Sequence, residues 1–394
     1  MIKGTEKAPA IRFRGFTDDW EQRKLGDECS EIVAGGDINK KNLLKDGRYP
    51  VIANALTDDG IVGYYANEYR IKAPAVTVTG RGDVGHAQAR KTNFTPVVRL
   101  LSVISKHNVD FLAEAINQNE VVLESTGVPQ LTVPTLANYL LRFPSTIEEE
   151  KKIGQCFSQI DHLITLHQHK LELQKKLKAF FLQNMFPEEG ETVPRIRFKG
   201  FTRDWEQRKL GEIGSTFTGL SRKTKEDFGH GDARFVTYMN VYSNSIADLA
   251  MTERVEIDQT QNSVKYGDIF FTTSSETPNE VGMSSVWLGN TENTYLNSFC
   301  FGYRPEVKVN PYYMAYMLRS PNVRNKLIIL AQGISRYNIS KNRVMDIEVP
   351  MPDLSEQKEI GQYFFNLDNL ITLHQRKIDQ LQTVKKFMLQ NLFI

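Results

Sequence analysis

The chain of 394 residues is longer than one ordinary domain and long enough for two or three. Lysine and arginine total 49 against 47 aspartate and glutamate residues, a formal net charge of +2, and 40% of the residues are hydrophobic. This balance excludes a disordered, collagenous or membrane-embedded protein, and also a nucleic-acid binder that relies on bulk positive charge. Only three cysteines occur, far apart, and no apolar segment follows Met1. We therefore expect a cytoplasmic protein without disulfides or a secretory signal.

The chain contains the same arrangement twice. A tag of 17 residues, IRFRGFTDDWEQRKLGD at 11–27, returns at 196–212 with three substitutions. Residues 148–186 align without gaps on residues 355–393, with about half of the positions identical. The segments between these repeats are much less alike. The order is therefore tag, variable segment and long repeat, followed by the same order again.

The predicted elements follow this order along the chain. After the first tag, residues 75–79 are typical of a strand that ends at Gly80, and residues 109–116 are typical of a short helix. After the second tag, residues 268–273 predict a strand and residues 311–318 a short helix. Each variable segment is therefore expected to be a mixed α/β domain with a small sheet.

Both long repeats are predicted to be helices that pair as a coiled coil. Neither contains proline, and apolar residues recur at alternate spacings of four and three, which is a heptad pattern. The expected seam consists of Ile153, Phe157, Ile160, Ile164, His167, Leu171, Ile360, Phe364, Leu367, Ile371, His374 and Ile378. The two histidines occupy equivalent positions, so a polar contact that fixes the register is favoured over a metal site.

The chain between the long helices predicts that they are antiparallel. At 1.5 Å per residue each helix is roughly 58 Å long, and a parallel pair would require about 18 intervening residues to return nearly that distance. The expected fold class is α+β: two mixed α/β globular domains joined by two long antiparallel coiled-coil helices, with a pseudo-two-fold internal repeat. The predicted segments are 1–19 (N-terminal repeat segment), 20–144 (first domain), 145–187 (first helix), 188–204 (repeat linker), 205–351 (second domain) and 352–394 (second helix).

Polar loops occupy corresponding places in the two domains. TGRGDVG at 79–85 and TTSSETP at 272–278 follow predicted strands, and a second pair of loops, at 126–132 and 333–341, precedes the long helices. Two stretches, at 39–42 and 221–225, are basic. Arginine, serine and threonine donate to phosphates and base edges, although ordinary surface loops have a similar composition. The candidate DNA-binding residues are Lys40, Lys41, Thr79, Arg81, Gln130, Arg222, Lys223, Lys225, Thr273, Ser274, Ser275, Arg336, Tyr337, Asn338 and Lys341.

Catalytic and metal sites are not expected. Residues 310–313 (NPYY) lack the second proline of the Asn-Pro-Pro-Tyr signature of amino-methyltransferases, and no glycine-rich cofactor turn accompanies them. The acidic residues at 352–358 fall at a helix start, where capping explains them. The cluster of His162, His167 and His169 has no cysteine or carboxylate at metal-ligand spacing.

The tag GFTxDWEQRKLG at 15–26 and 200–211 resembles the specificity subunits of type I restriction-modification systems. The same resemblance holds for PDLSEQKEI at 352–360 and the repeated LITLHQ of the long helices, and it covers nearly the whole chain. The segments at 219–225 and 271–282 look like target-recognition segments of that family. The first helix start, STIEEE at 145–150, departs from the Glu-Gln that the second keeps at Glu356–Gln357.

The resemblance implies a non-catalytic, sequence-specific DNA-binding subunit. In that family each target-recognition domain reads one half of a bipartite, asymmetric site on double-stranded DNA. The helices set the gap between the halves and dock two modification (methyltransferase) subunits, which restriction subunits then join. S-adenosylmethionine, ATP and Mg are expected on those partner subunits, and no cofactor on this chain. Two alternatives remain: a coiled-coil scaffold or other two-headed DNA-binding protein outside restriction-modification, and a self-sufficient enzyme, which the lack of a cofactor or metal motif disfavours.

Overall fold

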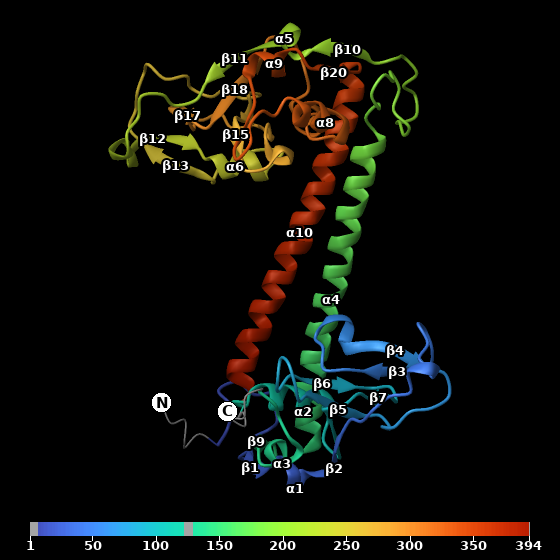
Figure 1. Ribbon diagram of the computed structural model, residues 1–394. Coiled ribbons are helices and arrows are strands. Elements are labelled where there is room, and N and C mark those ends of the chain that lie inside the picture. Colours follow the sequence, from blue (N-terminus) through green and yellow to red (C-terminus); the bar gives the residue numbers. More distant parts are fainter. Residues whose placement is uncertain (1–6, 122–128, 394) are drawn as a thin grey trace. The chain divides into compact units, whose positions relative to one another are not determined.

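The computed structural model describes residues 7–121 and 129–393, which form two compact units (Figure 1). Unit 1 consists of the chain up to Gln168 together with the chain from Gln375, and unit 2 runs from His169 to His374. Each unit thus contains one variable segment and parts of both long helices. The first six residues of the predicted 1–19 segment, and residues 126–128 of the predicted loop at 126–132, lie outside the described residues.

The two long repeats are helices, α4 (Ile147–Asn184) and α10 (Leu354–Leu392). In unit 1, Lys385 of α10 donates to both carboxylate oxygens of Asp161 in α4, at 2.8 and 2.9 Å, and the rings of Phe157 and Phe393 lie 5.8 Å apart. The later residue of α4 therefore contacts the earlier residue of α10. The two helices are antiparallel in unit 1, as expected.

Unit 2 contains the same antiparallel contacts with the roles of the helices exchanged. Lys178 of α4 pairs with Asp368 of α10, and the rings of Phe186 and Phe364 stack 5.8 Å apart. These four residues are offset by 207 positions from the contacts of unit 1, which is the offset of the sequence repeat. Eight side chains of the predicted seam are buried: Ile153, Phe157, Ile160, Leu171, Ile360, Phe364, Leu367 and Ile378. The other four are partly buried: Ile164, His167, Ile371 and His374.

The strands of the two units form sheets of the same order. Unit 1 contains β1 (Glu21–Lys24), β2 (Cys29–Ala34), β3 (Tyr49–Ile52), β4 (Ile61–Tyr65), β5 (Ala75–Thr79), β6 (Ala87–Arg90), β7 (Thr95–Pro96), β8 (Leu100–Ser105) and β9 (Leu140–Phe143). They form a four-stranded antiparallel sheet β2-β8-β5-β6, a three-stranded sheet β4-β3-β7 in which β3 and β7 are parallel, and the pair β1-β9.

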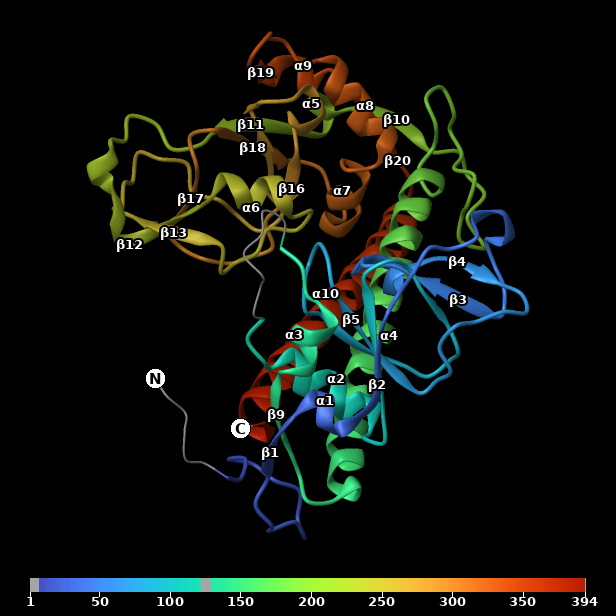
Figure 2. The same cartoon turned by 60° about the horizontal axis from the view of Figure 1, so that its bottom comes forward.

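Unit 2 contains β10 (Glu206–Lys209), β11 (Gly214–Thr218), β12 (Phe228–Val236), β13 (Thr252–Val255), β14 (Ile269–Thr272), β15 (Ser274–Ser275), β16 (Ser284–Val286), β17 (Thr294–Leu296), β18 (Cys300–Pro305), β19 (Tyr337–Asn338) and β20 (Glu348–Met351). The sheets are β11-β18-β14-β16, β13-β12-β17, β10-β20 and the small pair β15-β19. The β13-β12-β17 sheet lies on the side of unit 2 away from α7 and α8 (Figure 2).

Short helices complete each unit. Unit 1 has α1 (Leu25–Glu28), α2 (Val109–Asn117), α3 (Val133–Ala137), and the 3-10 helices η1 (Lys40–Asn42) and η2 (Thr57–Gly60). Unit 2 has α5 (Leu210–Ile213), α6 (Tyr238–Ser243), α7 (Pro311–Met317), α8 (Pro321–Ile329), α9 (Lys341–Met345), η3 (Lys225–Asp227) and η4 (Pro278–Glu280). No helix in the described ranges is long and apolar enough to span a bilayer.

The glycine near the start of each long helix allows α2 or α7 to approach closely. The side chain of Asn108 accepts the Phe111 N–H at the start of α2, and Asn310 accepts the Tyr313 N–H at the start of α7, both at 3.0 Å. A Cβ added at Gly361 would lie 2.7 Å from the Tyr313 nitrogen, and Gly154 faces Asn108 in the same way. The repeated glycine is therefore required by packing.

Each tag binds the start of one long helix through a buried ion pair, which we call the clamp. In unit 1, Arg12 donates two hydrogen bonds of 2.7 and 2.8 Å to Glu149. In unit 2, Arg197 donates two of 2.6 and 2.8 Å to Glu356. The paired arrangement matches the planar guanidinium fork to a carboxylate. Each clamp thus joins the two kinds of repeated segment, the tag and the long helix.

The departure of the first helix start from the second also has a structural reason. Glu150 accepts the backbone N–H of Asn108 at 3.0 Å, as Gln357 does for Asn310 at 2.9 Å. In addition, Glu150 contacts the Nδ1 atom of buried His107 at 2.7 Å, and Glu28 contacts the Nε2 atom at 3.0 Å. Burial lowers the pKa of His107, but the hydrogen bonds and charges of the two carboxylates outweigh it and raise the pKa. A glutamate at position 150 thus gives His107 a second carboxylate partner beside Glu28, which a glutamine would not provide.

Candidate nucleic-acid interface

In unit 1 the predicted loop at 79–85 is a tight connection between β5 and β6. The Thr79 hydroxyl donates to the Asp83 carbonyl and accepts the His86 N–H at 2.9 Å, so it shapes the loop from inside. Gly82 and Gly85 have φ values of 77° and 87°, a conformation that glycine adopts without strain. The side chain of Arg81 is left exposed at the tip.

The structure brings this loop together with the second predicted loop of unit 1. Arg81 and Gln130 form an isolated antiparallel bridge, and Leu131 donates its N–H to the Gly80 carbonyl at 3.0 Å. Arg99 donates to the Gln130 side-chain oxygen at 2.6 Å. Arg81, Arg99 and Gln130 are therefore neighbours, although Arg81 and Gln130 are 49 residues apart in the sequence.

Unit 2 has the same arrangement in a larger form. Ser274 and Ser275 form β15, which pairs antiparallel with Asn338 and Tyr337 of β19. Thr273 donates its hydroxyl to the Phe299 carbonyl at 2.6 Å, which fixes the strand just before β15. In both units, the loop after a central strand pairs with the loop that precedes the long helix.

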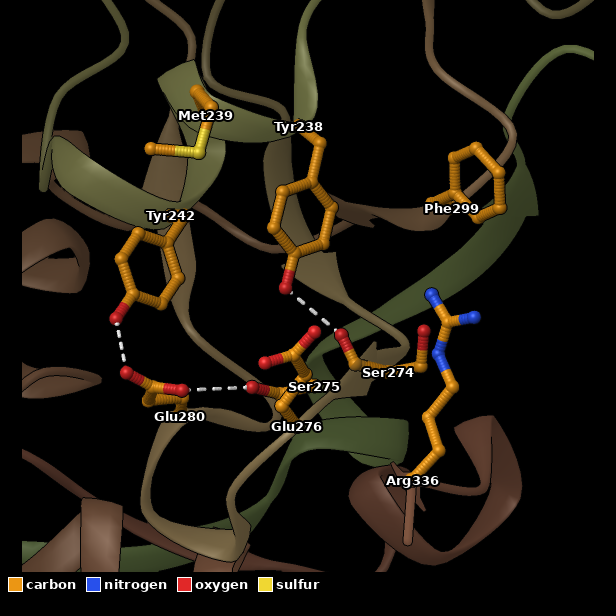
Figure 3. Close-up of a pocket in the computed structure, with 9 residues that line it drawn as sticks. All are labelled: Tyr238, Met239, Tyr242, Ser274, Ser275, Glu276, Glu280, Phe299 and Arg336. Carbon is orange, nitrogen blue, oxygen red and sulfur yellow. Dashed lines mark hydrogen bonds between the residues drawn. The ribbon is translucent and has the colours of Figure 1, made fainter.

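An open hollow of about 320 Å³ lies beside β15 and β19 (Figure 3). Its lining comes from α6, β15, the turn that follows β15, and the loops before β18 and β19: Tyr238, Met239, Tyr242, Ser274, Ser275, Glu276, Glu280, Phe299 and Arg336. Tyr238 and Tyr242 are four residues apart on α6, so they share one face, and their rings lie nearly parallel with centroids 6.2 Å apart. The hollow therefore has an aromatic wall and a polar floor.

The polar floor of the hollow is held by hydrogen bonds. Tyr238 donates to the Ser274 carbonyl at 2.8 Å. Tyr242 donates to one oxygen of Glu280 at 2.7 Å, and Ser275 donates to the other at 3.1 Å. The hydrogen bond from Tyr242 lowers the pKa of Glu280, which therefore stays ionised at neutral pH.

Two arginines, Arg324 buried and Arg319 partly buried, fix the walls of the hollow. Arg319 donates to the carbonyls of Val241, Tyr242 and Asn244, where α6 ends, at 2.9 to 3.0 Å. Arg324 donates to the carbonyls of Asn279, Val281 and Gly282, on both sides of Glu280 in the chain. Burial lowers the pKa of each guanidinium to about 10, so both keep their charge at neutral pH. Loop carbonyls held in this way make the hollow a preformed surface.

The other predicted residues lie on separate elements. Lys40 and Lys41 are exposed on η1, ahead of β3. Arg222 and Lys225 are exposed near η3, and Lys341 is partly buried at the start of α9. Lys223 lies near Arg222, but its ammonium is 3.0 Å from Asp258 and 3.8 Å from Asp227. Its charge is thus used within the fold.

Sequence reasoning missed several residues of this surface. Tyr238, Tyr242, Phe299 and Glu276 line the hollow, and Arg99 joins Arg81 in unit 1. The i, i+4 spacing of the two tyrosines was a detectable signal, but it does not indicate which face is exposed. Within the described residues, no group of histidine, cysteine, aspartate and glutamate side chains is placed to hold a metal ion.

Comparison with known proteins gives one family. The model of the type I restriction modification DNA specificity domain matches residues 17–175 and 202–383. The MjaVIII type I restriction enzyme specificity subunit of Methanocaldococcus jannaschii is 22% identical over 393 residues, which are 94% of this chain and 91% of that protein. The MjaX specificity subunit of the same organism is 28% identical over 211 residues, 52% of this chain and about half (48%) of the relative.

A solved structure has a similar fold. The crystal structure of the type I restriction-modification system S subunit from M. genitalium superposes with a TM-score of 0.65 and 15% sequence identity, covering 98% of this chain and 99% of that chain. At this identity the likeness concerns the fold alone. It agrees with the prediction of two mixed α/β domains associated with long helices.

Proposed function

Because the chain belongs to the DNA specificity subunits of type I restriction-modification systems, we propose that it is a non-catalytic reader of a bipartite, asymmetric sequence on double-stranded DNA. The main support for this proposal is that two loops meet at the same place in each unit. Arg81 pairs with Gln130 in unit 1, and Ser274 pairs with Asn338 in unit 2. The two sets expose different side chains on the same backbone arrangement. Such a duplication suits two readers of two different half-sites.

We propose that the residues at these loops contact base edges. Arg81 and Arg99 in unit 1, and Arg336 and Asn338 in unit 2, are exposed and carry groups that match base acceptors and donors. The exposed Lys40, Lys41, Arg222 and Lys225 would contact phosphates, which position a protein without reading sequence. Thr79, Thr273 and Ser275 would act through the loop conformation that their hydroxyls fix.

The long helices are proposed to set the gap between the half-sites and to dock two modification subunits. Apolar side chains at equivalent repeat positions are exposed on both helices: Leu163 and Leu370, Leu166 and Leu373, Phe180 and Phe387, each between 38 and 59% exposed. Exposed apolar surface that recurs in this way is typical of a protein interface. Equivalent surfaces would bind two copies of the same partner.

The remaining family properties belong to the same proposal. Residues 20–144 and 205–351 would be the two target-recognition domains, in a cytoplasmic complex. S-adenosylmethionine would be held by the modification subunits, and ATP and Mg by the restriction subunits that join them. A coiled-coil scaffold that never touches DNA is the alternative, and the exposed base-reading groups of both units disfavour it.

The proposal is tested by exchanging one domain. Residues 20–144 are replaced by the corresponding segment of another specificity subunit, the chain is produced with its modification subunits, and methylated adenines are mapped by single-molecule sequencing. One half of the methylated motif is expected to change and the other half to stay. Deleting seven residues from each long helix should shorten the gap by roughly 10 Å, about three base pairs. A motif that is unchanged by the exchange would favour the scaffold.

A further inference from the structure

The hollow of unit 2 contains two charged groups that the fold does not use. In the part of the chain that the structure describes, the side chains of Arg336 and Glu276 have no hydrogen-bond or ion-pair partner, and both residues are exposed. Figure 3 shows the Arg336 guanidinium on the Phe299 side of Ser274 and the Glu276 carboxylate beneath Tyr238. By contrast, both oxygens of Glu280 are occupied by Tyr242 and Ser275. The unit therefore presents one free fork of donors and one free acceptor at a single hollow.

The charge of the hollow excludes a phosphate as its ligand. Two carboxylates, Glu276 and Glu280, face one guanidinium, so a phosphate group would meet a net negative surface. A group that offers both acceptors and donors is suited instead. Base edges have this character, and phosphate oxygens do not.

We infer that unit 2 reads a guanine·cytosine pair in the major groove, with Arg336 bound to guanine and Glu276 to the paired cytosine. Guanine presents the N7 and O6 acceptors that match the two donors of a guanidinium. The cytosine beside it presents the N4 amino donor, which a carboxylate accepts. The two edges are adjacent in one base pair, as the two side chains are around one hollow. This inference rests on the proposed function and adds the base pair that one domain recognises.

The arrangement around the two side chains favours selective reading. β15 and β19 pair directly beside the hollow, and Arg319 and Arg324 fix its walls through six hydrogen bonds to backbone carbonyls. A preformed surface loses little conformational entropy on binding. Tyr238 and Tyr242 add an apolar wall that displaces water from the base edge, which strengthens polar contacts.

The experiment uses the complex of this chain with its modification subunits. Wild type, Arg336→Ala, Arg336→Lys and Glu276→Ala are each presented with a randomised duplex library, and bound or methylated sequences are counted. Arg336→Ala is expected to reduce the preference for guanine at one position of one half-site by roughly 5- to 150-fold, with every other position unchanged. Glu276→Ala should relax the same position by a smaller factor. Arg254→Ala, which removes the same charge from exposed β13, is the matched control and should leave the motif unchanged.

A chemical change in the DNA isolates the proposed contact. The selected guanine is replaced by 7-deazaguanine, which lacks the N7 acceptor. This replacement should weaken binding by wild type, though by less than Arg336→Ala does because the O6 acceptor remains, and should have no further effect on the Arg336→Ala complex. Because Arg336 is exposed and contacts no partner in the described residues, its replacement is not expected to impair folding, and Arg336→Lys provides a second check.

The possible outcomes separate the inference from the proposed function. If the wild-type complex selects no motif, the proposed function fails. If it selects a bipartite motif and Arg336→Ala weakens all sequences equally, Arg336 binds phosphate and the inference is wrong. The inference is also wrong if 7-deazaguanine weakens wild type and the variant by the same factor.

Discussion

The clamp of unit 2 can be compared with the clamp of unit 1 in the same molecule. Glu356 is 1% exposed and accepts three hydrogen bonds, two from Arg197 and one of 3.1 Å from Trp205 Nε1. Glu149 is equally buried but accepts only the two from Arg12, and the Nε1 atom of Trp20 has no hydrogen-bond partner among the described residues. The two sites thus differ by one buried hydrogen bond.

We predict that Glu356→Ala destabilises unit 2 more than Glu149→Ala destabilises unit 1. Removing one partner of a buried ion pair costs about 3–5 kcal/mol, because it leaves the other charge buried. Glu356→Ala also leaves the Trp205 N–H unpaired, which adds about 1–3 kcal/mol. In Glu356→Ala, Arg197 still donates one hydrogen bond, of 2.6 Å, to the Arg203 carbonyl. The total loss of stability should therefore be smaller than the sum of these two costs.

Native-state hydrogen exchange measures each unit separately, through peptides that cover the β1-β9 and β10-β20 pairs. The matched control is Arg197→Met combined with Glu356→Ala, which removes both charges and should recover much of the loss. Equal losses for Glu356→Ala and Glu149→Ala would show that the Trp205 hydrogen bond contributes nothing. A loss below about 1 kcal/mol for both would refute the role of the clamps, because exposed ion pairs contribute that little.

Two further predictions concern single residues of each unit. Since the folded-state pKa of His107 is raised, its stabilising contribution is complete below about pH 6.5 and is lost as the pH rises through the folded value. Unit 1 should therefore lose stability as the pH rises above about 6.5. His107→Gln should remove this dependence of the unfolding free energy on pH, which urea unfolding at a series of pH values measures. A pH dependence that is unchanged in His107→Gln would contradict the prediction. In unit 2, Gly302→Ala would place a Cβ 2.0 Å from the Cζ atom of the Phe217 ring, and should cost about 1–3 kcal/mol in the free energy of unfolding. Phe217→Leu in the same chain should restore part of the loss, and no restoration would contradict the ring contact.

The features that follow a local period were predictable from the sequence. The heptad spacing placed the long helices at 148–186 and 355–393, and they are observed at Ile147–Asn184 and Leu354–Leu392. The heptad period continues over about ten helical turns, and a pattern of that length does not arise by chance. The antiparallel direction was also predictable, because the number of residues between the two helices can be counted in the sequence.

The features that depend on packing between distant segments were not predictable. Nothing in the sequence indicates that Arg81 lies beside Gln130, that Tyr238 contacts Ser274, or that Tyr242 contacts Glu280. Glu150 looked like a departure from a family pattern, and only its contact with His107, 43 residues away, gives the reason. Composition does not distinguish Lys223, which forms an ion pair with Asp258, from exposed basic residues, and it does not point to the exposed Glu276.

Several of the basic side chains of this near-neutral chain are used within the fold. Arg12, Arg197, Lys178, Lys385, Lys223 and Arg304 pair with carboxylates, and Arg319 and Arg324 donate to backbone carbonyls. These groups hold the tags, helices and loops in place and add nothing to a positive surface field. Other cations, among them Lys40, Lys41, Arg222 and Lys225, are exposed and lie on separate elements. On the proposed function, these exposed cations contact phosphates, and the discrimination between bases comes from the small number of local contacts at the paired loops.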